Sequence, residues 1–243
     1  MPTLPIVEIL FAHNDEPLPE QFHHYAKPEN KTIDELSTRQ LSKWKSRRMA
    51  HFLLHQLFER HNLDTTLLNQ IHKTASGRPY VDHPQIDFNI SHSGDWVAII
   101  LTVCQPKIAT GIDIEHPQKT RRYLDLLNYY ADEQEIKELA SHSVLSTLPH
   151  RFYLSWCLRE AVLKSQGVGI VKLSEVAHSP SRLLIKTAYA PKGKLYFYHQ
   201  LPFYLAYFIE QPESGLLAPT LQQWKNNNYQ TSGQFSPIIY QVN

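Results

Sequence analysis

The chain has 243 residues, of which 42% are hydrophobic and 19% are charged, and its formal net charge is +1. A chain of this length and composition can bury a sizeable core, as one large domain or two small ones, and is not a disordered polyelectrolyte. The balanced charge excludes nucleic-acid binding over the whole surface, so we expect no nucleic-acid partner.

Two features of the sequence bear on location. The two cysteines, Cys104 and Cys157, are too few for a disulfide framework, and the first residues lack the basic start and apolar run of a signal peptide. The longest apolar run, residues 96–101, is far shorter than the roughly 18 residues that a membrane helix needs. The sequence therefore predicts a cytoplasmic protein without membrane contact.

The first part of the chain predicts a strand, a loop and two helices. Residues 5–12 predict the strand, and residues 13–32 predict the loop. A helical pattern starts at Thr32, a break is expected near Ser42, and a second helix is expected over residues 43–61.

The second helix begins in a basic segment, residues 39–48, with five cations in ten residues. This segment is either a solvated helix face or a clamp for a terminal phosphate. His51 and His55 follow on the same helix at i,i+4 spacing, but no third ligand accompanies them, so we expect no metal site there.

The next stretch predicts a turn and a hairpin. Residues 77–79 read Gly-Arg-Pro, which is typical of a turn, and residues 86–90 alternate as a strand. His92 ends this strand, and residues 96–103 return as a buried strand. A Ser91–His92 hydrolase dyad has poor geometry, because neighbouring strand residues point to opposite faces.

Acidic residues of a strand and a helix can converge farther along the chain. On a strand over residues 111–115, Asp113 and Glu115 share a face. On a helix over residues 152–164, Glu160 and Lys164 lie on the same face of the helix. Three carboxylates beside a lysine suit Mg²⁺, which takes a few carboxylates together with water and phosphate oxygens. The alternative is a wet strand face and an ordinary helical ion pair.

The remaining chain predicts one more capped helix and a strand meander. Asp132 is expected to cap a helix, and residues 183–185, 194–198 and 203–209 are expected to be strands. Residues 199–206 echo residues 92–99 faintly, as in an internal repeat. We expect the polar residues 211–243 to wrap the surface or fray.

These motifs resemble those of the 4′-phosphopantetheinyl transferases, in particular the larger single-chain type that activates peptide synthetases and acyl carrier proteins. That family carries a G-[IV]-D-x-E strand and then a W-x-x-K-E-x-x-x-K helix. Here Trp156 follows Asp113 by 43 residues, and Arg159 replaces the first lysine of the helix motif. Residues 77–79 and 88–93 match two further family motifs, and the resemblance spans residues 39–210.

The resemblance implies an α+β fold of two similar α/β halves related by a pseudo-twofold, each a small antiparallel sheet packed on helices. Residues 1–107 would form the N-terminal half, with the phosphate and adenine contacts of coenzyme A. Residues 108–243 would form the C-terminal half, with the Mg²⁺-binding and catalytic motifs and the C-terminal tail.

The implied reaction moves the 4′-phosphopantetheine arm of coenzyme A to a serine of an apo acyl or peptidyl carrier protein, with Mg²⁺, and releases adenosine 3′,5′-bisphosphate. The resemblance also implies a monomer. It leaves open whether the carrier serves fatty-acid, polyketide or peptide synthesis, and whether Glu160 or a metal-bound water accepts the serine proton. Two rivals are a Mg²⁺-dependent phosphodiesterase acting on coenzyme A and a non-catalytic module that binds coenzyme A or a carrier protein.

The resemblance assigns roles to particular residues. Gln134 stands where the family places a glutamate near the metal, which puts a further metal ligand in doubt. The implied metal ligands are Asp113, Glu115 and Glu160, and the implied catalytic residues are Glu160 and Lys164. The implied coenzyme contacts are Arg47, Arg48, Gly77, Arg78, Pro79, Ser91, His92, Arg159 and Lys164, with Arg48 as the best match for a clamp on the 3′-phosphate.

Overall fold

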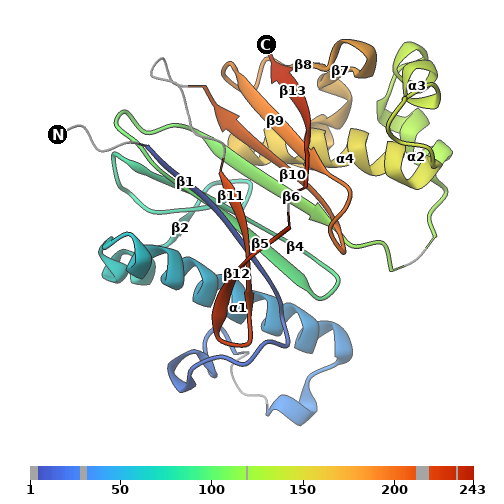
Figure 1. The fold of residues 1–243 in the computed structure, drawn as a ribbon. Coiled ribbons are helices and arrows are strands. Elements are labelled where there is room, and N and C mark those ends of the chain that lie inside the picture. The colour runs from blue at the N-terminus through green and yellow to red at the C-terminus, as the bar shows by residue number, and fades with distance from the viewer. Residues whose placement is uncertain (1–4, 28–31, 119, 212–218, 234) are drawn as a thin grey trace.

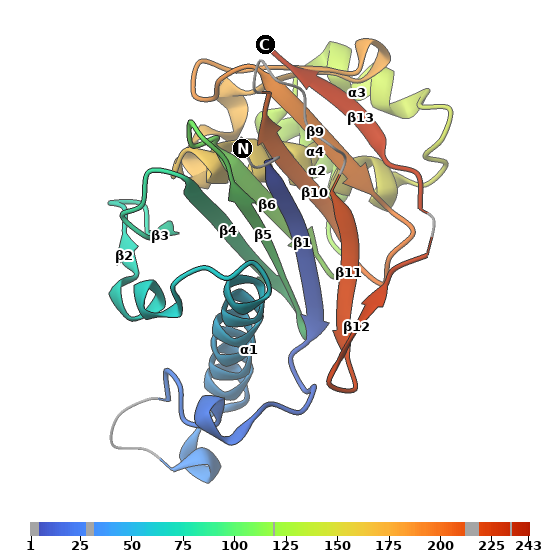
Figure 2. The ribbon, with the colours of Figure 1, turned by 60° about the vertical axis from the view of Figure 1, so that its left-hand side comes forward.

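The computed structural model describes residues 5–27, 32–118, 120–211, 219–233 and 235–243. Two sheets lie side by side, and each carries a long helix on its outer face (Figures 1 and 2). Among the described residues, no helix is long and apolar enough to cross a membrane. The structure is of the mixed α+β class that was expected from the sequence.

The two halves repeat one plan: a strand, a long helix and a two-stranded hairpin. In each half the last strand of the hairpin pairs antiparallel with the first strand. The first half contains β1 (Ile6–His13), α1 (Thr38–Arg60), β4 (Ile86–Ser93) and β5 (Trp96–Val103). The second half contains β6 (Thr110–Glu115), α4 (Leu148–Ser165), β9 (Gly193–Tyr198) and β10 (Tyr204–Glu210). This repetition explains the faint sequence echo, because residues 92 and 199 both lie near the end of the first strand of a hairpin, in β4 and just after β9.

Shorter strands and helices are added to this common plan. The other strands are β2 (His72–Lys73), β3 (Pro79–Tyr80), β7 (Ala177–Ser179), β8 (Leu184–Lys186), β11 (Thr220–Lys225), β12 (Asn228–Thr231) and β13 (Ile238–Val242). The other helices are α2 (Tyr123–Tyr130), α3 (Glu133–Ala140) and the 3₁₀ turns Glu20–Phe22, Ile33–Glu35, Thr65–Gln70, Ile170–Glu175 and Pro180–Arg182. Asp132 caps α3 as expected, since its side chain accepts a hydrogen bond from the Glu135 amide.

The C-terminal segment departs from the sequence expectation. Residues 220–231 form β11 and β12, and β11 pairs in parallel with β1 of the first sheet. Residues 238–242 form β13, which joins the second sheet between β9 and β8. The described part of this segment therefore extends both sheets instead of fraying. The polar composition misled the prediction, because β11 and β13 are held by backbone pairing with strands far away in the sequence, which local composition does not reveal.

Three apolar clusters hold the two sheets and the helices together. The first lies between α1 and the first sheet, the second between α4 with α2 and the second sheet, and the third between the two sheets. Strand alternation produces this division: Leu10 of β1 faces α1, whereas Ile9 and Phe11 face the second sheet.

The helix α1 is longer than expected. It runs without a break through Ser42, from a capping box in which the Ser37 side chain accepts the Gln40 amide. Its apolar face is buried over almost the whole length, and this tertiary packing outweighs the weak local signal for a break.

Candidate functional site

The site begins with a close approach between β6 and α4. A Cβ atom at Gly111 would lie only 2.1 Å from the Ala161 carbonyl oxygen, so glycine is required there. Ile112 and Ile114 enter the core between the sheets, and alternation therefore turns Asp113 and Glu115 toward α4. The expected convergence of the strand and helix acids follows from this contact.

We call Asp113, Glu115 and Glu160 the acid cluster. The Lys164 ammonium lies 2.6 Å from Asp113 Oδ1 and 3.8 Å from Glu160 Oε2. Side chains of β4 complete the surroundings, because Ser91 Oγ donates to Asp113 Oδ1 at 3.2 Å. A single ammonium thus faces several carboxylates in a largely buried place.

The electrostatics of the acid cluster show an excess of negative charge. The pKa of Glu160 is raised to about 7, because burial and the charges of Asp113 and Glu115 together outweigh the opposing effect of Lys164. Burial and the charge of Asp113 also raise the pKa of Glu115. Burial lowers the pKa of Lys164, but the charges of Asp113 and Glu160 outweigh this effect. The pKa of Lys164 is therefore raised overall. The cluster is therefore suited to bind further positive charge.

A cleft of about 370 Å³ opens beside the acid cluster. Residues of both halves line it, with Gly77 and Asn89 on one side and Glu160 and Lys164 on the other. Gly77 has a φ of +89°, which few residues other than glycine adopt, and this fixes the turn at the rim of the cleft.

A second cleft of about 390 Å³ lies along α1. It shares Gly77, Pro79 and Ile90 with the first cleft, so the two meet at the Gly-Arg-Pro turn. Arg47 and His92 line it as well. The pKa of His92 is lowered, first because its ring is partly withdrawn from solvent and then by nearby positive charges, including those of Lys164 and Arg47.

The structure separates Arg48 from this second cleft. The Arg48 guanidinium stacks over the Trp44 ring, 4.6 Å from its centroid, and Asp15 acts on it electrostatically. Arg47 is the basic-segment arginine that lines the cleft with His92. Adjacent helical positions point about 100° apart, so the two arginines face different surroundings, and the match of Arg48 to the 3′-phosphate clamp stays a prediction.

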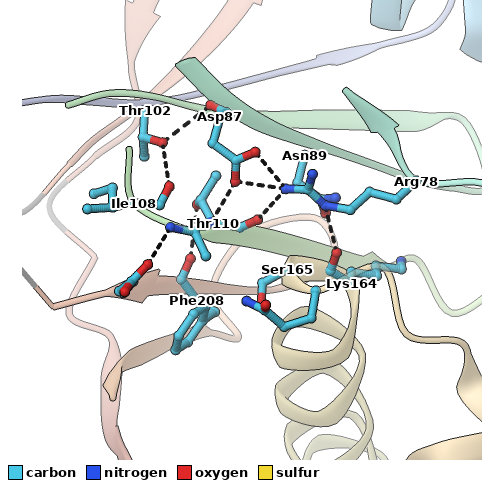
Figure 3. Close-up of polar contacts among 12 residues, drawn as sticks. Arg78, Asp87, Asn89, Thr102, Ile108, Thr110, Lys164, Ser165 and Phe208 are labelled. Carbon is cyan, nitrogen blue, oxygen red and sulfur yellow. Dashed lines mark hydrogen bonds and ion pairs between the residues drawn. The ribbon is translucent and has the colours of Figure 1, made fainter. Parts of the chain in front are cut away.

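Arg78 also lies differently from its expected role. Its Nη2 donates to Asp87 Oδ2 at 2.8 Å and to the Thr110 carbonyl at 3.2 Å, and its Nε donates to the Lys164 carbonyl at 3.0 Å (Figure 3). The guanidinium is thus engaged by the protein, although the residue borders the first cleft. Arg78 therefore joins the two halves through Nε and Nη2, and its contact with a coenzyme phosphate stays a prediction.

Arg159 is not part of the acid cluster, although it precedes Glu160. Its guanidinium is buried and donates to both carboxylate oxygens of Glu135, at 2.8 and 2.5 Å. It also donates to Ser155 Oγ, and His178 Nδ1 lies 2.8 Å from Glu135 Oε1. We call Arg159, Glu135, Ser155 and His178 the buried ion network. Because the donors of Arg159 are occupied there, the expected contact with coenzyme phosphates is not supported.

Two further positions differ from the resemblance. Gln134 is exposed and donates to Glu138, so it lies on the outer face of α3. Ser91 is buried and accepts the Ile114 amide at 3.2 Å while it contacts Asp113. Ser91 therefore supports the acid cluster from behind rather than facing a coenzyme-sized cleft.

The acid cluster fits a divalent cation in its chemistry. Asp113 Oδ2 is buried without a hydrogen-bond partner, and all the acidic donors are hard oxygens of the kind Mg²⁺ prefers. In the described part of the chain, no three acidic, histidine or cysteine side chains are already arranged as a metal site. Lys164 lies against Asp113, where it supplies part of the missing positive charge.

Comparisons with known proteins decide the family. A family model described as the 4′-phosphopantetheinyl transferase superfamily matches residues 109–214. The chain is 44% identical over 230 residues to a Haemophilus influenzae protein provisionally named 4′-phosphopantetheinyl transferase, covering 94% of this chain and 92% of that protein. The chain belongs to the 4′-phosphopantetheinyl transferase superfamily. It is accordingly an enzyme that transfers phosphopantetheinyl groups.

More distant transferases match less than half of this chain. A phosphopantetheinyl transferase of Thraustochytrium is 33% identical over 114 residues, which cover 42% of this chain and 38% of that protein. The human L-aminoadipate-semialdehyde dehydrogenase-phosphopantetheinyl transferase is 27% identical over 112 residues, which cover 42% of this chain and 35% of that protein. The family expected from the motifs is thereby confirmed.

Sequence reasoning missed several residues around the site of this transferase. Glu135 was unremarked, yet it is the buried partner of Arg159. Arg121 lies 3.6 Å from Glu115, on a loop that carried no motif. Asp87 and Asn89 alternate with apolar residues on β4, and this polar face on an otherwise buried strand was the available signal for a contact across strands.

Proposed function

We propose that this transferase moves the 4′-phosphopantetheine arm of coenzyme A to a serine of an apo carrier protein. The serine Oγ attacks the β-phosphorus of the coenzyme and forms the new phosphodiester bond. The bond between the β-phosphorus and the bridging oxygen breaks, and adenosine 3′,5′-bisphosphate leaves. Positioning and charge neutralisation supply most of the rate in reactions of this kind.

The two connected clefts support a placement for the coenzyme. The nucleotide end would occupy the cleft along α1, with its 3′-phosphate near Arg47 and His92. The pyrophosphate would pass the Gly77–Pro79 turn and reach Lys164 in the first cleft. In this proposal residues 1–107 mainly hold the nucleotide and residues 108–243 mainly perform the chemistry, apart from the tail strands of the first sheet.

The acid cluster and Lys164 would have separate roles. Lys164 would neutralise charge that develops on the phosphate oxygens. Asp113, Glu115 and Glu160 would hold Mg²⁺, which when bound neutralises the pyrophosphate. Glu160 would also accept the serine proton on a carboxylate oxygen. Bound Mg²⁺ would lower the pKa of Glu160 from its metal-free value of about 7, whereas burial and the neighbouring acids act in the opposite direction and keep this carboxylate more basic.

The carrier is proposed only as a class, an acyl or peptidyl carrier protein with an accessible serine. The first part of the human relative's printed name is that of a semialdehyde dehydrogenase, so we do not restrict the proposal to one kind of carrier. The monomeric state and the cytoplasmic location expected from the sequence stay predictions.

The observation that carries the proposal is the convergence of Asp113, Glu160 and Lys164 at a cleft lined by both halves. The test is to incubate the protein with an apo acyl carrier protein, coenzyme A and Mg²⁺ and to measure the intact mass of the carrier. We expect one phosphopantetheine to be added, and one equivalent of adenosine 3′,5′-bisphosphate to appear.

Control reactions distinguish the rivals. A phosphodiesterase would release adenosine 3′,5′-bisphosphate from coenzyme A without any carrier. A binding module would bind coenzyme A in calorimetry and leave every mass unchanged. An apo peptidyl carrier protein tested in parallel shows which class of carrier is preferred, and failure with both classes would contradict the proposed reaction.

A further inference from the structure

The two sheets meet along β4 and β6, which are edge strands of different sheets. Alternate side chains of β4 each accept a hydrogen bond from a backbone amide. These amides belong to alternate residues of β6 and to His116, which directly follows β6. The pairs are Asp87 Oδ2 with Thr110 N at 2.9 Å, Asn89 Oδ1 with Ile112 N at 3.0 Å, Ser91 Oγ with Ile114 N at 3.2 Å and Ser93 Oγ with His116 N at 3.0 Å. We call this set the side-chain ladder.

The side-chain ladder fixes the relative position of the strands. In each pair the two residue numbers differ by 23. Because this difference is constant, β4 and β6 run in the same direction and keep one register. Hydrogen-bonding groups alternate along a strand, so residues 111, 113 and 115 present their amides to β10 while the intervening amides face β4. A shift by one residue would place Phe88 or Ile90 opposite those amides and leave buried donors unpaired, which is costly.

Arg78 fastens one end of the side-chain ladder to α4. Asp87 accepts from Arg78 and from the Thr110 amide, and the same guanidinium donates to the Lys164 carbonyl (Figure 3). The backbone that carries Lys164 is therefore tied to β4, as is the strand that carries Asp113. Neighbouring positions of β4 present Ile90 and His92 to the cleft along α1.

We propose that the side-chain ladder holds the coenzyme-binding half in register with the acid cluster, and that Asn89 at its centre is a positioning residue. The predicted effect on kcat rests on the proposed function, whereas the predicted effect on amide exchange does not. Ser91 and Ser93 each touch a carboxylate of the acid cluster, whereas Asn89 acts on the cluster through the backbone of Ile112. A displacement of about 1 Å between reacting groups can lower a rate about 100-fold.

The test combines amide exchange with kinetics of Asn89→Ala. Exchange of the Ile112 amide, followed by NMR, should become at least about tenfold faster, while the amides of Gly111 and Asp113 keep their protection on β10. In carrier modification, kcat should fall about 10- to 100-fold, and KM for coenzyme A should change less than about threefold.

Two further variants guard against a general loss of stability. Phe88→Leu lies on the opposite face of the same strand, in the core against α1, and should leave kcat per folded molecule and Ile112 exchange near the wild-type values. Asn89→Ser keeps an acceptor of the kind that works at positions 91 and 93, so it should recover a substantial part of both properties. It also provides a folded variant if Asn89→Ala does not fold.

Three outcomes would overturn the inference. Unchanged Ile112 exchange in Asn89→Ala would show that the amide does not depend on the side-chain ladder. An unchanged kcat would remove the positioning role, and a raised KM alone would make Asn89 a direct coenzyme contact. If wild-type protein modified no carrier, the proposed function would fail, but the exchange experiment would still decide whether Asn89 holds β6.

Discussion

The helix α4 carries two charged regions that begin at adjacent residues and behave oppositely. Arg159 enters the buried ion network, where Glu135 accepts two of its hydrogen bonds and opposite charges are matched. Glu160 enters the acid cluster, where like charges accumulate and Asp113 Oδ2 has no partner. A charge-matched network holds a fold together, whereas a cluster with an excess of like charge can bind a ligand of opposite charge. The comparison suggests that stability and catalysis are divided between the two regions.

The largest expected effect is the loss of activity in Glu160→Gln. The carboxylate charge and the proton acceptor disappear, so carrier modification should slow on the order of 10³-fold. The free energy of unfolding should change by less than about 1 kcal/mol at pH 6, because glutamine resembles the neutral acid that the raised pKa favours. Stopped assays of carrier mass and urea unfolding measure the two quantities.

The matched control is Glu175→Gln, an exposed acid on the turn after α4. Its carrier modification should stay near the wild-type rate. Near-normal turnover of Glu160→Gln would contradict the assignment of the acid cluster.

The reverse pattern is expected for the buried ion network. Glu135→Gln leaves the buried Arg159 charge unpaired, which should lower the free energy of unfolding by about 3–5 kcal/mol. At a temperature where the variant is folded, kcat should remain within a few-fold of the wild type, since no group at the clefts is removed. Thermal unfolding and carrier modification measure both. A destabilisation below about 1 kcal/mol would show that the network is not a structural element.

Arg47 and Arg48 of α1 are a second pair of adjacent residues with different expected roles, one at the cleft and one packed on Trp44. Arg47→Ala should raise KM for coenzyme A about 10- to 100-fold, because a charge-assisted phosphate contact contributes about 1.5–3 kcal/mol. It should also reduce discrimination against the analogue without the 3′-phosphate. Arg48→Ala, the matched control, should change KM less than about threefold, since that side chain stacks on Trp44. Equal effects of both substitutions would remove the distinction.

The two regions should also differ in the sign of their pH dependence. The pKa of Glu160 is raised from 4.5 to about 7, so its contribution to stability is present below pH 4.5 and is lost as pH rises through about 7. For Glu135, burial opposes ionisation, but His178 and Arg159 lower the pKa to about 2. Its contribution is present above pH 4.5 and is lost as pH falls toward 2.

Urea unfolding over a pH series without divalent ions measures these contributions. Glu160→Gln should flatten the neutral part of the profile, and Glu135→Gln should flatten the acidic part. A neutral slope that persists in Glu160→Gln would assign it to another group.

The smallest effect is expected at Gln134, the position where the family has an acid. Its side chain is exposed and pairs with Glu138 on the outer face of α3. Gln134→Glu should therefore leave the Mg²⁺ dependence of the rate superimposable on the wild type and change stability by less than about 0.5 kcal/mol. A lower Mg²⁺ requirement in this variant would place the residue at the metal after all.

Much of this arrangement follows from local patterns. The alternation around Asp113 and the i,i+4 spacing of Glu160 and Lys164 correctly predicted which faces would meet, because each depends only on the period of its own element. The strand, hairpin and long helix of each half followed in the same way.

The rest depends on contacts between elements that no local pattern specifies. Arg159 is drawn inward by Glu135, which lies on a different helix. Arg78 is held through Nε and Nη2 by Asp87 and by two carbonyls from distant segments, and a motif match alone could not show these contacts. The tail strand β11 owes its place to pairing with β1, at the opposite end of the chain.

In the proposed function, the acid cluster performs the transfer and the buried ion network does not. The most direct test of this assignment is the intact mass of an apo carrier after incubation with coenzyme A and Mg²⁺ and equal folded amounts of wild type, Glu160→Gln or Glu135→Gln. We expect wild type and Glu135→Gln to add one phosphopantetheine, whereas Glu160→Gln should leave the carrier in its apo form over the same period. Full modification by Glu160→Gln, or an inactive but folded Glu135→Gln, would contradict the assignment.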